Sequence, residues 1–229
     1  MTYLSGSKDY SSFPLTFHQW LIASCTFSYM LLCSRVIVTG HITYVFLLWN
    51  LFLAFVPYAI SWGLSSNPPV IKNKWILVFS LCSWLLFIPN AFYIVTDFFH
   101  LRDIHSAPNW FDLLLLLSFA WNGLVFGIAS LRKIETILYA ISGRTFSVFT
   151  IFAVMWMNAY GMYLGRFLRY NSWDIITRPF SLFDEIASML LHPFDNKMEW
   201  GMILCYAVFM TLFYITIKKL AENFSHHNK

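Results

Sequence analysis

A membrane-spanning helix is predicted to end within the stretch Tyr160-Gly-Met-Tyr-Leu-Gly-Arg-Phe-Leu-Arg-Tyr-Asn-Ser-Trp-Asp174. The stretch closes a long apolar run and brings two arginines, an asparagine, a tryptophan and an aspartate into one short segment. Charged side chains at a membrane boundary cost free energy unless they are paired, hydrated or in contact with lipid headgroups. We therefore expect their partners on the same side of the membrane.

The composition indicates a helical membrane protein. The 229 residues are 59% hydrophobic and only 11% charged, whereas a soluble domain is about 25% charged. The formal net charge of +4 is scattered over short loops, so it does not predict nucleic-acid binding. The four cysteines lie inside apolar runs without metal-ligand spacing, which is typical of small buried side chains.

Six apolar runs are long enough to cross a bilayer, for which a helix needs about 20 residues. They predict an all-α transmembrane bundle that forms one domain, residues 1–229, without an internal repeat. We expect the spans near residues 15–34, 42–64, 75–95, 112–131, 145–166 and 199–217.

Two connections have the pattern of short amphipathic helices in the membrane interface, one on each side. In the first, apolar residues follow Ser181 at helical spacing as far as Pro193. In the second, an apolar stripe runs from Ile134 to Ile141 and is closed by Gly143. Both are expected to be structural, and a lid over the outer leaflet is an alternative for the first.

The distribution of charge predicts an orientation. Nine lysines and arginines fall on one side of the six spans and six on the other, and the positive-inside rule then places both termini in the cytoplasm. Eight of the eleven acidic residues fall on the opposite, outer side. Because ionisable groups of both signs gather there, we expect a functional site on the outer side.

The third span ends with four polar side chains within an arc of about 80° on a helical wheel: Asn90, Tyr93, Asp97 and His100. A polar stripe on a membrane helix faces protein or water rather than lipid. For Asn90 and Tyr93, helix packing and ligand contact are both open. Asp97 next to His100 has the pattern of an acid–base pair, because a carboxylate can orient an imidazole.

Two other interpretations of this pair are open. Asp97, His100 and Asp103 have the spacing to hold a divalent metal, although this is not an established zinc motif. Alternatively, the acids form a salt-bridged helix end with Arg102.

The fifth span ends with Arg166 and Arg169, whose spacing places both guanidinium groups on one face. Planar paired donors suit phosphate or carboxylate, so internal pairing, lipid phosphate and an anionic substrate all remain open. Asn171 and Asp174 have the spacing of a helix N-cap with a favourable acid, next to an interfacial Trp173. Asp112 opens the fourth span, either as a helix-start acid or as a member of the site.

Three blocks together resemble a known family: Pro89-Asn-Ala-Phe-Tyr-Ile-Val-Thr-Asp-Phe-Phe-His-Leu101, Trp110-Phe-Asp112 and Tyr163-Leu-Gly-Arg-Phe-Leu-Arg-Tyr-Asn-Ser-Trp-Asp174. The family is the uncharacterised bacterial membrane family named domain of unknown function 1361. The resemblance runs from about Asn50 to the last span. Family members commonly have tyrosine at Phe111 and proline at Phe92. The resemblance implies a bacterial cytoplasmic membrane protein and brings no activity.

The leading hypothesis is an outward-facing site for an anionic or polar ligand near the outer leaflet. As a hydrolase or transferase on a lipid-linked or envelope substrate, it would use Asp97, His100, Asp112 and Asp174 for catalysis, with or without a divalent metal. Ligand contacts would come from Arg166, Arg169, Asn171, Trp173, Asn90 and Tyr93. The alternative is a non-catalytic scaffold or a transport-linked or lipid-binding subunit, in which the charges are structural. The lipid bilayer is the expected partner in both cases, and the sequence leaves the oligomeric state open.

Overall fold

A computed structural model describes residues 16–102 and 107–227, and every regular element in these ranges is a helix. Five elements are long and apolar enough to cross a membrane, which agrees with an integral membrane protein. In chain order the elements are α1 (Phe17–Thr39), α2 (Phe46–Ser66), α3 (Pro68–Lys72), α4 (Lys74–Tyr93), the 3₁₀-helix η1 (Ile94–Arg102), α5 (Asn109–Arg166), α6 (Asp174–Thr177), α7 (Pro179–Leu191) and α8 (Lys197–His227).

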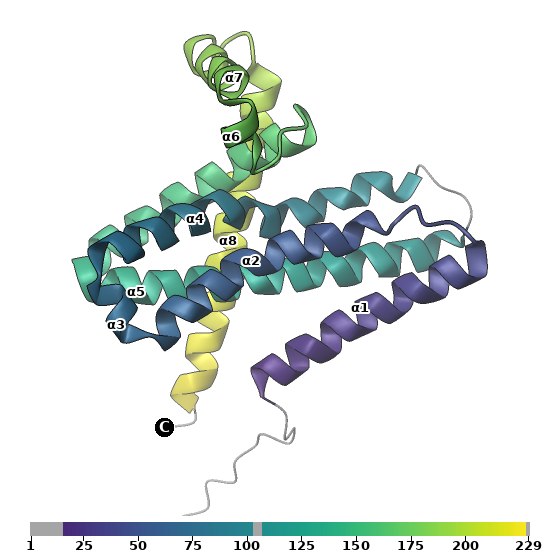
Figure 1. Ribbon diagram of the computed structural model, residues 1–229, viewed down its shortest axis with the longest axis horizontal. Coiled ribbons are helices and arrows are strands. Elements are labelled where there is room, and N and C mark those ends of the chain that lie inside the picture. The colour runs from purple at the N-terminus through teal and green to yellow at the C-terminus, as the bar shows by residue number, and fades with distance from the viewer. Residues whose placement is uncertain (1–15, 103–106, 228–229) are drawn as a thin grey trace, which may run out of the picture.

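The long element α5 is a hairpin of two helices that are joined at Gly143 (Figure 1). Gly143 has φ 81° and ψ 177°, a backbone conformation that is essentially restricted to glycine. We call residues 109–142 the first arm and residues 144–166 the second arm. The two arms correspond to the predicted fourth and fifth spans.

The stripe from Ile134 to Ile141 does not form a separate interfacial helix. It continues the first arm without a break, and Ile134, Ile137 and Leu138 are buried in the same apolar cluster as Tyr214 of α8. The amphipathic spacing therefore reflects packing against protein rather than against headgroups. The sequence pattern alone does not distinguish these two environments.

On the other side, α7 corresponds to the predicted interfacial helix. It begins at Pro179, two residues before Ser181, at which the predicted helix starts. Proline suits the first position of a helix because its missing N–H has no intrahelical partner there. The Ser181 hydroxyl instead donates to the Arg178 carbonyl oxygen.

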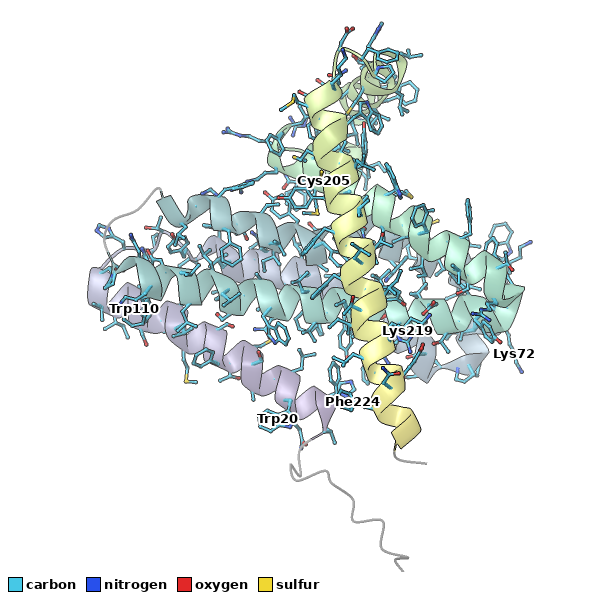
Figure 2. The ribbon with its side chains drawn as sticks, turned by 180° about the vertical axis from the view of Figure 1, so that it is seen from behind. Trp20, Lys72, Trp110, Cys205, Lys219 and Phe224 are labelled. Atoms are coloured by element: carbon cyan, nitrogen blue, oxygen red, sulfur yellow. The ribbon has the colours of Figure 1, made fainter. Side chains whose placement is uncertain are left out.

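The helices are tilted relative to one another. The helix α8 crosses α5 steeply, and α1 runs in an intermediate direction (Figure 1). Trp20 near the start of α1 and Phe224 near the end of α8 lie on the same side of the molecule (Figure 2).

A buried glutamate holds three helices together at one end of the bundle. The carboxylate of Glu135 accepts hydrogen bonds from Tyr214 (2.7 Å), Lys218 and Arg132. Its backbone carbonyl accepts from Ser147 of the second arm at 2.9 Å. Glu135 lies 23 residues beyond Asp112 on one helix, a distance of about 34 Å, which is close to the thickness of the hydrocarbon core.

Gly143→Ala is expected to lower the free energy of unfolding by about 1–3 kcal/mol, because a Cβ is strained at this φ and ψ. Gly63→Ala is the matched control. Gly63 lies inside α2 with open space around its missing Cβ, so alanine should be neutral or stabilising by up to about 1 kcal/mol. Denaturant titration in detergent measures both. Equal stability of the two variants would contradict the hairpin geometry.

Candidate functional site

Asp97 and His100 lie on η1, where the backbone changes from α-helix to 3₁₀-helix after Tyr93. The expected continuous α-helix passes Pro89 but stops four residues later. A 3₁₀-helix has three residues per turn, so residues three apart are aligned. The side chains of Asp97 and His100 therefore project on the same side of η1, and Asp97 is buried.

Arg166, at the end of the second arm, contacts both of these side chains. Its Nη1 lies 3.0 Å from His100 Nε2 and 3.8 Å from Asp97 Oδ1. The Asn50 amide on α2 donates to Asp97 Oδ2 at 2.8 Å. The predicted meeting of Asp97, His100 and Arg166 is therefore present, and we call these three residues the arginine cluster.

The contact with Arg166 determines which role His100 Nε2 has in a hydrogen bond. A guanidinium group has only donors, so His100 Nε2 must be the acceptor and carries no proton while this hydrogen bond exists. The ring also packs edge-on against Phe46, with centroids 5.3 Å apart. Arg166 thus occupies the lone pair that a general base would use. The arrangement is suited to holding an anion, and acid–base chemistry at Nε2 requires Arg166 to move.

Asp112 does not join the arginine cluster. It forms a buried bidentate pair with Arg35 of α1, with Nε–Oδ1 2.7 Å and Nη2–Oδ2 3.2 Å. The Arg35 guanidinium also lies 4.4 Å from the ring centroid of Tyr44. The Tyr44 hydroxyl in turn donates to the His100 carbonyl oxygen at 3.1 Å. Asp112 therefore ties α1 to α5 beside the arginine cluster, and a catalytic role for it finds no support in this geometry.

Arg35 was not considered as a partner of Asp112, because the predicted first span ends near residue 34 and leaves Arg35 in the connection that follows. The helix α1 instead continues to Thr39, and Arg35 is 1% exposed. An arginine within an apolar helix requires a nearby acid, and this requirement is the signal that points to Arg35.

Arg166 and Arg169 do not lie on one face of a continuous helix, as the spacing predicted. The helix ends at Arg166, and Arg169 adopts a left-handed conformation with φ 58°. The Tyr170 N–H then bonds the Leu164 carbonyl oxygen, six residues earlier, at 3.0 Å and closes the end of the helix. Arg169 is exposed and makes no ion pair within the described residues.

Asp174 pairs locally with Arg178, one helical turn further along the chain. Its carboxylate accepts from Arg178 Nη2 at 3.0 Å, from the Asn171 N–H at 2.7 Å and from the Thr177 hydroxyl at 2.8 Å. The prediction had the Asn171 side chain capping the helix, whereas the Asp174 side chain accepts from the Asn171 backbone N–H. A salt bridge between residues four apart is a common helix pattern, so Arg178 was identifiable from the sequence. This closed pair does not support a catalytic Asp174.

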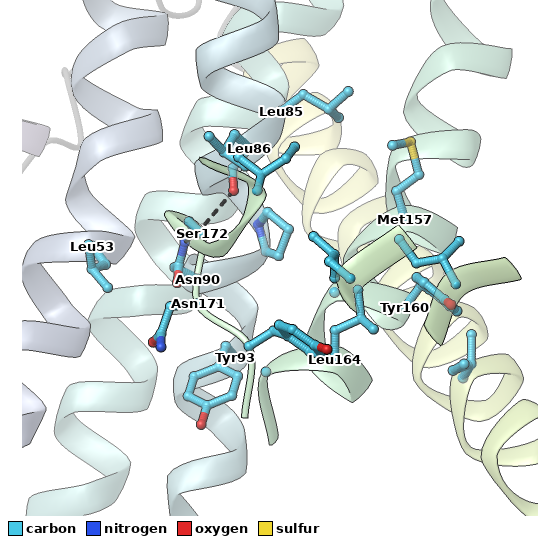
Figure 3. Close-up of a pocket in the computed structure, with 18 of the residues that line it drawn as sticks. Leu53, Leu85, Leu86, Asn90, Tyr93, Met157, Tyr160, Leu164, Asn171 and Ser172 are labelled. Atoms are coloured by element: carbon cyan, nitrogen blue, oxygen red, sulfur yellow. Dashed lines mark hydrogen bonds between the residues drawn. The ribbon is translucent and has the colours of Figure 1, made fainter. Parts of the chain in front are cut away.

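Asn90 and Tyr93 line a cavity of about 710 Å³ beside the arginine cluster. The Asn90 amide donates to the Ser172 hydroxyl at 2.9 Å, and Ser172 donates to the Leu86 carbonyl oxygen (Figure 3). A Cβ at Gly165 would lie 3.1 Å from the Tyr93 ring, and one at Gly161 would lie 3.0 Å from Pro89. The two glycines thus allow a close approach between the second arm and α4.

Of the other predicted ligand contacts, Asn171 lines the cavity. Trp173 does not line it; it is 41% exposed and packs edge-on against Trp49 of α2, with centroids 6.4 Å apart. The predicted metal site included Asp103, which lies outside the described residues. Within residues 16–102 and 107–227, no three His, Cys, Asp or Glu side chains gather in a way that would hold a metal. Metal binding by Asp97 and His100 stays a prediction.

Asp112→Ala is expected to lower the free energy of unfolding by about 3–5 kcal/mol, because it removes the carboxylate from a buried guanidinium group. The double variant Arg35→Met/Asp112→Leu should recover most of this loss. Asp195→Asn is the control, since the His192–Asp195 pair is exposed and should change stability by less than about 1 kcal/mol. A double variant no more stable than Asp112→Ala would contradict this pairing.

Arg178 holds the pKa of Asp174 well below its usual range, with further help from the Asn171 N–H. A depressed pKa stabilises the folded form above the unfolded pKa of about 3.9, and the effect fades as the pH falls below it. The Arg178 N–H, which bonds the Asp174 carbonyl oxygen, should therefore lose protection in acid. Hydrogen exchange, corrected for intrinsic rates, measures this loss, which Asp174→Asn should abolish. An unchanged acid response in Asp174→Asn would contradict the assignment.

Comparison with known proteins gives one match. The model of a family described as "Protein of unknown function (DUF1361)" matches residues 49–213. No curated protein and no solved structure matches the chain. The matched range contains the arginine cluster, the Asp174–Arg178 pair and all of the residues that line the cavity. Because the match covers well over half of the sequence, the protein belongs to the DUF1361 family.

Proposed function

We propose that this protein binds an anionic or polar ligand at the end of the bundle that carries the arginine cluster. We place this end at the outer leaflet of a bacterial cytoplasmic membrane, with both termini in the cytoplasm. The orientation follows from the excess of lysine and arginine in the opposite loops.

The observation that carries the proposal is the partial exposure of Arg166 and the exposure of Arg169. Arg166 is held at 3.8 Å from Asp97 and keeps 14% of its side-chain surface exposed. Arg169, three residues later, is exposed. A phosphate or carboxylate can therefore contact Arg169 and approach Arg166, and such charge-assisted contacts are strong.

An enzymatic version uses the same residues. An anionic ligand that draws Arg166 toward itself releases His100 Nε2, which then serves as a base for a water or hydroxyl nucleophile. Arg166 and Arg169 neutralise the developing charge. The reaction class would be hydrolysis or group transfer on a lipid-linked or envelope substrate.

A scaffold is the second candidate, and the paired acids favour it. Asp112 and Asp174 both form closed pairs with arginines of their own. In a scaffold the arginine cluster is a third such connection, between the second arm and η1.

Substitution of Arg166 distinguishes these candidates. Arg166→Gln should weaken binding of a short-chain phosphatidate by about tenfold or more, because it removes a charge-assisted hydrogen bond. His100→Gln retains an acceptor for Arg166 and should retain binding. Arg144→Gln, an exposed arginine remote from the cluster, is the control. Titration calorimetry of the detergent-purified protein measures all three.

Folding must be separated from binding, because Arg166→Gln leaves Asp97 buried beside a neutral residue. The double variant Arg166→Gln/Asp97→Asn removes that charge as well. If the double variant is folded and binds phosphatidate as tightly as the wild type, the binding proposal fails. If the single variant unfolds and the folded double variant has lost binding, the proposal stands.

A further inference from the structure

The cavity beside the arginine cluster has mainly apolar walls that come from six helices. They are α2, α4, the second arm of α5, α6, α7 and α8. Leucines, aromatic rings and methionine dominate the lining; examples are Leu85, Met157, Tyr160, Leu164 and Trp200. Such walls favour a hydrocarbon occupant, because a small hydrated anion gains nothing from apolar contact.

One side of the cavity is polar. Asn90, Asn171 and Ser172 gather there, opposite Met157 and Tyr160 (Figure 3). Asn50 also lines the cavity and bonds Asp97 of the arginine cluster. The exposed Arg169 directly precedes Tyr170, another lining residue. The apolar walls therefore meet amide and hydroxyl groups at one side of the cavity, and Arg166 and Arg169 directly adjoin the lining residues Gly165 and Tyr170 in the sequence. This combination suits an amphipathic ligand.

The helix α7 separates this cavity from the surroundings. Leu182 and Ile186 line the cavity, whereas Phe180, Phe183 and Leu191 are between 69% and 84% exposed. The described contacts of the α7 backbone are mainly with α6. Asp184 and Glu185 of α7 are also exposed, so α7 is an amphipathic helix with apolar residues toward the cavity and further apolar residues outside it. This pattern fits a helix at the membrane interface, next to a bound chain.

We propose that the cavity holds a hydrocarbon chain of a phosphate-bearing membrane lipid, which enters from the bilayer past α7, with its headgroup at Arg169 and Asn171. This inference deepens the proposed function and rests on it only for the position of the headgroup. The position of the hydrocarbon chain is inferred from the apolar walls and from α7 alone.

Photoactivatable lipids test the position of the chain. The purified protein in nanodiscs is labelled with a phosphatidate or a diacylglycerol that carries the same diazirine chain, and the labelled peptides are mapped. The wild type should be labelled at residues 156–165 and 182–190, and unlabelled phosphatidate should compete. Ile186→Trp places a ring in the cavity. Each excluded methylene weakens binding about fourfold, so specific labelling should fall about tenfold or more. Phe183→Trp, on an exposed position of α7, should leave labelling unchanged.

The outcomes separate the two proposals. If both lipids label these peptides equally and Ile186→Trp abolishes the labelling, the chain site stands and the anionic headgroup site fails. If Ile186→Trp and Phe183→Trp have the same effect, or if no labelling is competed, the chain site is overturned. Competition by inorganic phosphate as effective as that by phosphatidate would identify a free anion as the ligand and also overturn the chain site.

Discussion

The contact of one guanidinium group with both Asp97 and His100 sets the geometry of the end of the bundle that carries the arginine cluster. The hydrogen bond from Arg166 to His100 joins residues 66 positions apart in the sequence. For this contact, the second arm must return to the level of η1 after the turn at Gly143. Close approach at Gly161 and Gly165 then places α4 against the second arm. The turn, the glycines and the 3₁₀ segment together allow Arg166 to reach its partners. A charged side chain among apolar helices needs such partners.

The buried ions at both ends also fix the register of the helices. Arg35 and Asp112 join α1 to α5 at one end, and Glu135 joins the two arms to α8 at the other. Buried pairs add little net stability compared with apolar packing, but a pair that is broken by a shift of one turn costs several kcal/mol. Apolar helix surfaces slide past one another more easily. We therefore interpret these pairs chiefly as devices that select one alignment.

The sequence predicted the helical class and the meeting of Asp97, His100 and Arg166, because hydropathy and helical spacing report directly on both. It did not predict the partner of Asp112, because spacing along one helix says nothing about which neighbouring helix lies opposite. Arg178, the partner of Asp174, was identifiable from its spacing of four residues and was overlooked. Arg169 was misplaced for a local reason: the helix ends at Arg166, and a left-handed residue redirects the chain. The cavity was also missed, since its walls come from six helices and no single segment carries its pattern.

The state of His100 favours binding over catalysis in this conformation. An imidazole that accepts from Arg166 is neutral, and its lone pair is already engaged. A site organised for proton transfer would instead orient the ring with a carboxylate and leave the second nitrogen toward the reactant. Here the guanidinium lies between the acid and that nitrogen. Any catalysis would therefore begin with a ligand that competes for Arg166, so that anion binding comes first in either interpretation.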